Sequence, residues 1–310
     1  MTTSILPPAD RRRRSSGQPL PLPPEEFSPE EVLAEELRKL TFTERAEIEE
    51  EVHGVRCGAA EETPELIQRS LREFDTILNS RKESEPDNHL LRNVVRTSLL
   101  DETEAKAAAS KCYLNDPDFR LRFLRCETFC VKEAVQRLIK FLAFSRELFG
   151  DYIADRPMRL SDFTREEEKI LQNSRTQPLP FRDRSGRRVF VSVGGCNFDL
   201  SLQLRYKIMM YMHWVVSEDI ETQRKGYVAV VWMFDEDERP NTFQKLWQKL
   251  RKKHKTFDTA YNGSRPTRLC SFHFFVPQNS PFLRTMANIY SFTKRPEERK
   301  RFKPFFGTYY

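Results

Sequence analysis

Residues 226–234, GYVAVVWMF, are the feature that most narrows the folds open to this chain. Nearly every position is apolar, as expected for a strand that is covered on both faces of a parallel sheet. Strand-like runs at 189–193 and 268–276 lie on either side of it, and helix-like segments at 200–215 and 242–254 separate the three. Strands that alternate with helices of this length predict an α/β domain with a largely parallel sheet and flanking helices.

The pattern around this domain predicts four parts. Residues 1–27 are basic and proline-rich and are expected to be disordered. Residues 28–112 are predicted to be an all-helical N-terminal extension, either a separate bundle or a part packed on the core. It is expected to contain a linker at 81–88 and a helix-like segment at 90–100. Thr-x-x-Glu sequences predict capped helix starts at Thr41–Glu44 and, in the α/β domain, at Thr164–Glu167. Residues 113–156 are predicted as a helical segment, and 157–310 as the α/β domain, which includes a helix at 281–292 and a final strand at 302–306.

Two motifs lie where the helical segment meets the α/β domain. Residues 119–138, FRLRFLRCETFCVKEAVQRL, are interpreted as a basic and aromatic turn followed by an amphipathic helix. The helix has an apolar stripe made by Val131, Val135, Leu138, Ile139 and Leu142. Residues 179–191, LPFRDRSGRRVFV, are interpreted as a charged tight turn at Asp183–Gly186 followed by a strand.

Together the two motifs resemble signatures of the CRAL-TRIO lipid-binding family. The matching residues are Leu121, Arg122, Phe123, Leu124, Arg125, Phe129, Val131 and Ala134 in the first motif and Pro180, Arg182, Asp183, Gly186, Arg187 and Val189 in the second. A third segment, residues 264–277, is similar to the family's turn and strand near Tyr-Pro-x-Arg-Leu. The resemblance covers about residues 115–310 and implies a single lipid held between the sheet and a mobile gate helix.

The C-terminal half has enough apolar side chains to line such a cavity, including methionines, which repack readily around flexible ligands. The expected wall residues are Met209, Met210, Met212, Trp214, Val230, Trp232, Phe272, Phe274 and Val276. The alternative is that the same side chains fill a solid core. The expected gate is the helix at 281–292, with the apolar residues Phe282, Leu283, Met286, Ile289 and Tyr290.

Basic residues follow the gate segment in the sequence: Lys294, Arg295, Arg299, Lys300, Arg301 and Lys303. Apolar side chains beside a basic run are typical of a surface that docks on anionic membranes. The alternative is an ordinary amphipathic helix with a solvated basic end. A second basic stretch, at 244–257, is expected only to solubilise the outer face of a helix that packs on the sheet.

Three departures from the family pattern bear on the ligand. Family members that bind phosphatidylinositol have a lysine where this chain has Thr128, an acid where it has Thr267, and a lysine near Phe302 or Arg301. An inositol phosphate needs cationic donors paired with an acceptor. We therefore expect phosphatidylinositol not to be held in the usual way. The family also continues past the last strand, so the chain is expected to lack a C-terminal closing segment.

Composition favours a cytoplasmic protein, and its net positive charge permits attraction to anionic membranes or to nucleic acid without selecting either. Peripheral association with membranes is expected from the gate and docking residues. The 310 residues have a net charge of +6 and a mean hydropathy of −0.66, and no apolar run approaches the ~20 residues that span a bilayer. The first residues have no apolar core of a secretory signal. The six cysteines are scattered, which favours reduced thiols. Cys126 and Cys130 are expected to be two small buried residues.

Other function classes have weaker support. An enzyme is not expected, because the Gly194-Gly195 turn lacks nucleotide-binding spacing and no hydrolase or metalloprotease motif is present. The acidic residues 235–238 are expected to be a solvated loop, and no nucleic-acid-binding motif accompanies the basic stretches. No cofactor other than a bound lipid is expected. The main alternative is a ligand-free scaffold of the same fold that binds a protein partner through its N-terminal helices.

Overall fold

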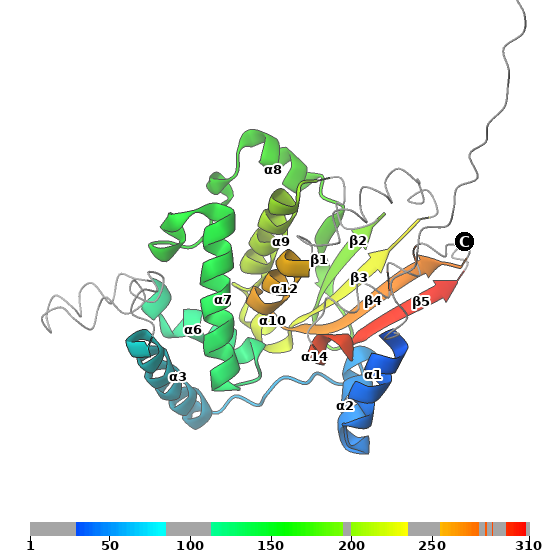
Figure 1. Ribbon diagram of the computed structural model, residues 1–310, viewed down its shortest axis with the longest axis horizontal. Helices are drawn as coiled ribbons and strands as arrows, with labels where there is room; N and C mark the ends of the chain where they lie inside the picture. Colours follow the sequence, from blue (N-terminus) through cyan, green and yellow to red (C-terminus); the bar gives the residue numbers. More distant parts are fainter. Residues whose placement is uncertain are drawn as a thin grey trace, which may run out of the picture.

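The computed structural model describes residues 29–84, 113–194, 200–234, 255–278, 283, 287 and 296–307. These residues form an α/β structure in which helices pack against a five-stranded, mostly parallel sheet (Figure 1). The α/β prediction is therefore confirmed. The helix-like segments predicted at 90–100 and 242–254, the acidic residues 235–238 and most of 281–292 lie outside the described residues.

The sheet has its strands in chain order. They are β1 (Thr176–Arg182), β2 (Arg188–Val193), β3 (Tyr227–Trp232), β4 (Leu269–Pro277) and β5 (Phe302–Gly307). β1 pairs antiparallel with β2, and the other three pairs are parallel. β2 to β5 begin and end within two residues of the predicted strands. β1 was not predicted, because Pro178 and Pro180 argue against a strand in the interior of a sheet. β1 lies at the edge of the sheet, where proline is tolerated.

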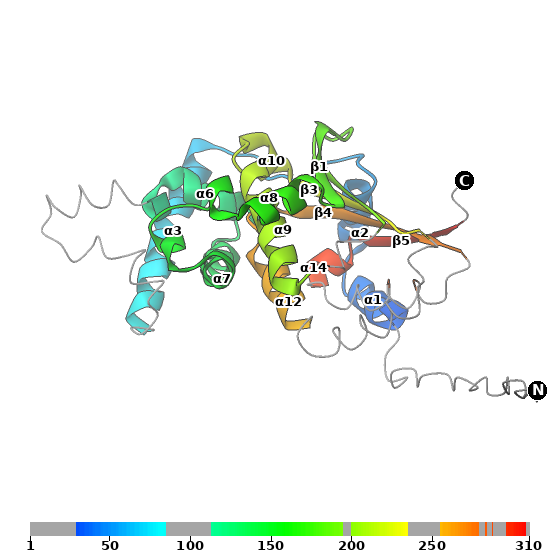
Figure 2. The same ribbon diagram turned by 90° about the horizontal axis from the view of Figure 1, so that it is seen from above.

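Described helices between the parallel strands pack on one side of the sheet. β2 is joined to β3 through α9 (Leu202–Val216) and α10 (Ile220–Lys225), and α12 (Lys255–Ser264) precedes β4. A sheet that grows in one direction with right-handed crossovers collects its connections on one face. The helices α7, α9 and α12 lie on one side of the sheet in Figures 1 and 2. α12 had not been predicted from the sequence.

The first motif forms two helices, which corrects the predicted turn at its start. α6 (Pro117–Cys126) is capped by Asp116, and α7 (Val131–Phe149) follows after a short turn. Thr128 and Phe129 have φ of 48° and 64° in that turn. Cys126 is buried, but Cys130 is exposed at the start of α7, so the prediction of two buried cysteines was wrong for Cys130.

Aromatic side chains bind α6, α7 and α9 into one layer. The ring of Phe141 lies 5.3 Å from that of Phe123 and 5.9 Å from that of Trp214, centre to centre. Phe141 and Phe123 are almost fully buried. The predicted apolar stripe of α7 faces this layer, with Val135, Leu138 and Leu142 buried. α9 packs against this layer on one side and against the sheet on the other.

The remaining described helices complete the frame. They are α1 (Pro29–Arg38), α2 (Phe42–Val52), α3 (Pro64–Ser84), α8 (Arg165–Gln172) and α14 (Pro296–Arg299), with short 3-10 helices at Tyr113–Asn115, Asp151–Ala154 and Leu160–Asp162. The predicted capping boxes at Thr41–Glu44 and Thr164–Glu167 are both present. A linker predicted from residue 81 was wrong at its start, because α3 continues to Ser84.

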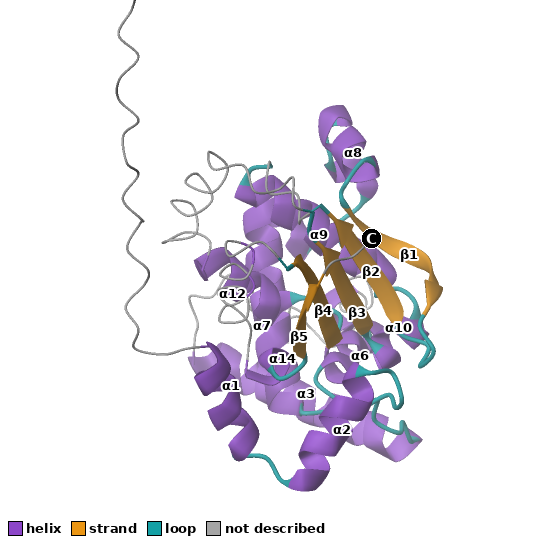
Figure 3. Ribbon diagram, turned by 90° about the vertical axis from the view of Figure 1, so that its right-hand side faces the viewer, coloured by secondary structure: helices purple, strands orange, loops and turns teal. Residues whose placement is uncertain are grey.

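The N-terminal helices pack on the α/β core in two places. α3 contributes Phe74 and Leu78 to the aromatic layer next to α7. α1 and α2 instead lie beside one end of the sheet, near α14 and the strands β4 and β5 (Figures 1 and 3). Val52 at the end of α2 is 1% exposed. Both contacts are consistent with an extension packed on the core.

Candidate functional site

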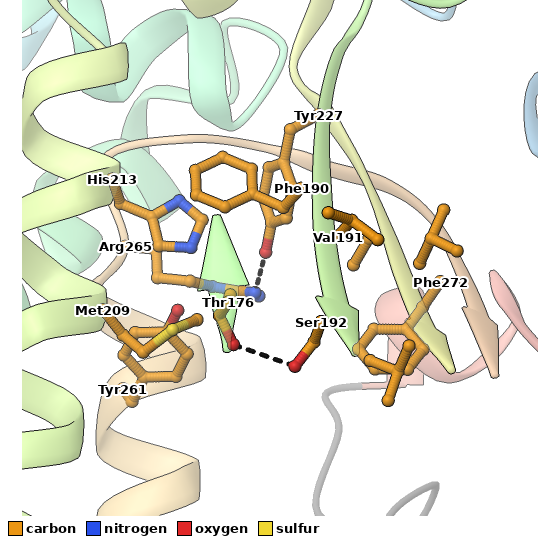
Figure 4. Close-up of a pocket in the computed structure, with 13 residues that line it drawn as sticks. Thr176, Phe190, Val191, Ser192, Met209, His213, Tyr227, Tyr261, Arg265 and Phe272 are labelled. Carbon is orange, nitrogen blue, oxygen red and sulfur yellow. Dashed lines mark hydrogen bonds between the residues drawn. The ribbon is translucent and has the colours of Figure 1, made fainter. Parts of the chain in front are cut away.

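A cavity of about 40 Å³ lies between the sheet and the helices α9 and α12 (Figure 4). The strands contribute Phe190, Ser192, Ala229 and Phe272, among others. Met209 and His213 from α9, Tyr261 from α12 and Arg265 just after it lie across from the strands; the other lining residues are Thr176, Val191, Tyr227, Val230 and Val231. The walls are thus mainly apolar and aromatic, with a few polar groups placed among them.

The polar groups in the cavity bond to one another. The hydroxyls of Thr176 and Ser192 are 2.9 Å apart and join β1 to β2. Arg265 donates to the hydroxyl of Tyr227 and to the carboxylate of Glu298. Arg265 is 2% exposed and Glu298 is 7% exposed, so this is a buried ion pair at the cavity wall. The cationic charge in the wall is therefore balanced from within the protein.

His213 is a buried neutral side chain between the cavity and the loop before β4. Its Nδ1 is 2.7 Å from the hydroxyl of Thr267, and its ring stacks on Phe190 at 4.7 Å. Burial, reinforced by the nearby positive charge of Arg265, holds the pKa of His213 well below its usual value. Thr267, which stands where phosphatidylinositol-binding members of the CRAL-TRIO family have an acid, thus forms a buried hydrogen bond with His213.

The depressed pKa of His213 predicts a loss of stability in mild acid. The unfolded chain binds the proton near pH 6.5 while the folded chain resists it, so stability is complete above that pH and falls below it. We expect about 1.4 kcal/mol of unfolding free energy to be lost per pH unit below the unfolded pKa. Chemical denaturation at about pH 7.5 and about pH 5.5 measures it. A His213→Gln variant should have a flatter profile, and an equally steep one would contradict this assignment.

The nine predicted wall residues fall into different environments. Met209 and Phe272 line the cavity. Val230 also borders it, but its side chain alternates with those of Ala229 and Val231 and points to the other face of the sheet. Met212, Phe274 and Val276 belong to the same buried cluster as Phe272. Met210 and Trp214 face the aromatic layer on the other side of α9. Trp232 stacks on Phe275 at 5.2 Å, and its neighbour Val231 lies in the buried cluster, so alternation directs Trp232 to the other face of the sheet.

Only part of the predicted gate lies among the described residues. Leu283 and Ala287 are helical, 1% and 0% exposed, and belong to the buried cluster of Phe272 and Val231. The gate segment therefore contacts the same face of the sheet as α9 at these two positions. The predicted gate residues Phe282, Met286, Ile289 and Tyr290 and the predicted docking residues Lys294 and Arg295 lie outside the described residues.

The other predicted docking residues face acids of the N-terminal helices. Arg299 pairs with Glu36 of α1, Arg301 lies 3.0 Å from Glu51 of α2, and Lys303 lies 2.7 Å from Glu49. We call Arg299, Lys300, Arg301 and Lys303 the basic strip. Sequence reasoning had predicted these residues to dock on a membrane, with a solvated basic end as the alternative, and had not predicted pairing with the N-terminal helices.

Glu51 is the centre of the contact between α2 and the sheet. Its carboxylate accepts from Arg268 at 2.6 Å, from Arg301 and from the backbone N–H of Gly58 at 2.9 Å. Its backbone carbonyl accepts from Arg187. Glu51 is 2% exposed, and burial opposes its charge, but the two guanidinium groups outweigh this and keep the pKa of Glu51 below its usual value. The second motif is thereby tied to α2, since Asp183 holds Arg187 at 2.6 Å.

Sequence reasoning missed Arg265, Glu298 and Glu51. Each is one charged residue among many in a chain with 52 basic and 46 acidic side chains, and only their burial sets them apart. Thr176 and Ser192 were missed with β1. The one signal available was the resemblance at Asp183 and Arg187, which form an ion pair in the structure.

Other chemistries find little support in the described part of the chain. No group of three or more His, Cys, Asp or Glu that could hold a metal ion was found there. Burial raises the pKa of Cys126 to about 11 and that of Cys270 to about 12, which makes these thiols poor nucleophiles. Within the described ranges, no helix has the length and apolar character needed to cross a membrane.

Comparison with known proteins adds no assignment: no model of a known family matches this chain, and no curated protein matches it.

Proposed function

We propose that this chain binds one hydrophobic molecule, such as a phospholipid, a sterol or an isoprenoid, between the sheet and the helices α9 and α12, and exchanges it with membranes. The observation that carries this proposal is the cavity, whose strand and helix walls are mainly apolar. The resemblance of the two motifs to CRAL-TRIO signatures also supports the proposal. No covalent chemistry is part of the mechanism.

The wall of the cavity favours a ligand without a strongly anionic group at this position. Arg265 is already paired with Glu298 and Tyr227, and His213 is neutral. The hydroxyls of Thr176 and Ser192 offer neutral hydrogen bonds. This supports the expectation that phosphatidylinositol is not held in the usual way.

Ligand entry requires the cavity to expand. Its volume of about 40 Å³ accommodates a few water molecules at most, whereas sites for lipid-sized ligands measure ~300–1,000 Å³. Leu283 and Ala287 lie in the buried cluster that adjoins the wall, so separating their segment from the sheet would enlarge the space. The small volume is also the observation that favours the second candidate function, a ligand-free scaffold that binds a protein partner.

Filling the cavity should abolish ligand binding. Ala229→Trp places a large side chain among the lining residues, and we expect the lipid that copurifies with the protein to fall at least about tenfold, because the ligand and the indole need the same space. Lipid extraction and mass spectrometry measure it.

The matched control is Val193→Trp on the neighbouring strand. Val193 is 44% exposed, so the same side chain there should leave the lipid content unchanged. Thermal unfolding of both variants checks that they fold. An Ala229→Trp protein that folds and carries as much lipid as the wild type would contradict the proposed site.

Exchange should depend on the gate segment. Met286→Glu combined with Ile289→Glu adds two charges to a segment that we propose enters the membrane interface, where charged groups are disfavoured. We expect transfer of lipid between vesicles to slow by about tenfold or more. Unchanged transfer would contradict the gate assignment. The proposed cavity would then be tested independently by the Ala229→Trp variant.

A further inference from the structure

The helices α1 and α2 carry a strongly acidic surface. α2 has five glutamates and one arginine, and α1 has four glutamates and one arginine. The residues from Arg299 to Lys303 include the four cations of the basic strip. Three of these cations pair with Glu36, Glu49 and Glu51. The fourth, Lys300, contributes to lowering the pKa of Glu44, although the hydrogen bonds from Thr41 are the larger cause.

The pairs form two layers that differ in exposure. The inner layer is Glu51 with Arg268 and Arg301, and the Glu51 side chain is 3% exposed there. The outer layer is Glu49 with Lys303, whose side chains are 53% and 31% exposed, and Glu36 with Arg299, whose side chains are 17% and 12% exposed. An exposed ion pair contributes little to stability, so another anion can replace Glu49 on Lys303 at small cost. The pair of Glu36 and Arg299 is less exposed, so its replacement requires α1 to move off the strip. The inner layer can hold α2 in place while that happens.

Apolar groups lie next to the outer layer. Phe305 follows the basic strip on β5, is 36% exposed and lies on the same face of the strand as Lys303, two positions before it. Phe306 is 42% exposed and, by the same alternation, points to the opposite face. β5 is the last strand in the order of the sheet, so both side chains lie at its edge. An anionic membrane surface attracts cationic side chains, and exposed aromatic side chains beside them can enter the interface. An ion pair on the surface of a protein does not require such aromatic neighbours.

We infer that the acidic residues of α1 and α2 occupy the basic strip and compete with an anionic membrane for binding to it. In the structure the acids neutralise Arg299, Arg301 and Lys303. When the protein meets a surface rich in anionic lipid, the lipid phosphates and carboxylates replace Glu36 and Glu49 on the strip. This inference rests on the proposed membrane exchange and adds its regulation: docking is selective for membranes with enough negative charge to displace the helices.

The test is binding to vesicles of phosphatidylcholine with about 30% phosphatidylserine, by cosedimentation. A Glu36→Gln, Glu49→Gln variant should bind at least about fivefold more tightly than the wild type, since each cation near an anionic surface is worth about a factor of five. The gain should disappear on pure phosphatidylcholine and at high salt.

A charge-matched variant separates this contact from net charge. Glu35→Gln, Glu47→Gln changes the net charge equally, but Glu35 pairs with Lys39 and Glu47 with Arg56 rather than with a cation of the strip. It should raise affinity less than twofold. An equal gain in both double variants would overturn the inference, as would no gain in Glu36→Gln, Glu49→Gln.

A third variant tests whether the strip is the surface that the helices cover. Adding Lys300→Gln and Lys303→Gln to the Glu36→Gln, Glu49→Gln protein should cancel the gain, and persistence of the gain would overturn the inference. Lipid copurification with each variant keeps the proposed function separate. If a lipid is bound but vesicle affinity is insensitive to Glu36 and Glu49, the regulation fails while the proposed function stands.

Discussion

Replacing Glu51 with alanine is expected to lower the free energy of unfolding by about 3–5 kcal/mol. The carboxylate is buried and is shared by Arg268 and Arg301, so its removal leaves guanidinium groups without their acceptor at a site with little water. The N–H of Gly58 also loses its bond to Glu51. Chemical denaturation followed by circular dichroism measures the loss.

Glu50→Ala is the matched control for Glu51→Ala. Glu50 is the preceding residue on α2 and has a half-exposed side chain. Its carboxylate is 4.0 Å from Arg56, at the outer limit of an ion pair. Its removal should change the free energy of unfolding by less than about 0.5 kcal/mol. A loss of equal size in both variants would indicate a general effect on helix α2, and the central role of Glu51 would be wrong.

The lowered pKa of Glu51 gives the same contact a pH dependence. Its stabilising effect is complete above the ordinary carboxyl value of 4.5 and is lost as the pH falls through the lower pKa of the folded protein. The wild type should therefore lose stability in this acidic range more steeply than Glu51→Gln, in which the titrating group is absent. The effect of His213 begins at higher pH, near 6.5, and is absent in His213→Gln, so measuring Glu51→Gln and His213→Gln side by side separates the two effects.

Removing the Arg265 side chain has the second large expected effect, about 3–5 kcal/mol for Arg265→Ala. Arg265 joins the cavity wall to Tyr227 on β3 and to Glu298 on α14. In the variant, Glu298 would be a buried carboxylate without this cation. Glu298→Ala should also destabilise the protein, because Arg265 would keep a buried charge.

A double-mutant cycle tests whether the two residues act as a pair. Because the double variant leaves neither charge buried alone, Arg265→Ala with Glu298→Ala should cost less than the sum of the single changes by at least about 1 kcal/mol. Additive losses would contradict the coupling. Ligand content should also change in Arg265→Ala, since Arg265 lines the cavity.

Much of the fold follows from local patterns. The apolar run of β3 and the repeat of strand and helix around it predicted four strands and α9, and the Thr-x-x-Glu sequences predicted two helix starts. β1 was missed because its prolines are acceptable only at an edge, and edge position is a property of the whole sheet. α6 was interpreted as a turn, although Asp116 and Pro117 are good signals for a helix start.

The site was less accessible to sequence reasoning. Met209 and Phe272 could be predicted as wall residues because they are apolar and belong to elements that meet, but Met210 and Trp214 lie on the opposite side of the same helix. For a helix that is buried all round, such as α9, the sequence does not distinguish the two faces. The pairing of the basic strip with Glu36 and Glu49 joins residues more than two hundred positions apart, and no local pattern encodes it.

Native mass spectrometry of the purified protein, followed by lipid extraction, tests the proposed function most directly. We expect one hydrophobic molecule bound at near one-to-one, lost in Ala229→Trp and retained in Val193→Trp. Its identity would name the ligand class. A compact, folded protein without any bound lipid, which also takes up none from vesicles, would contradict the proposed function and favour the ligand-free scaffold.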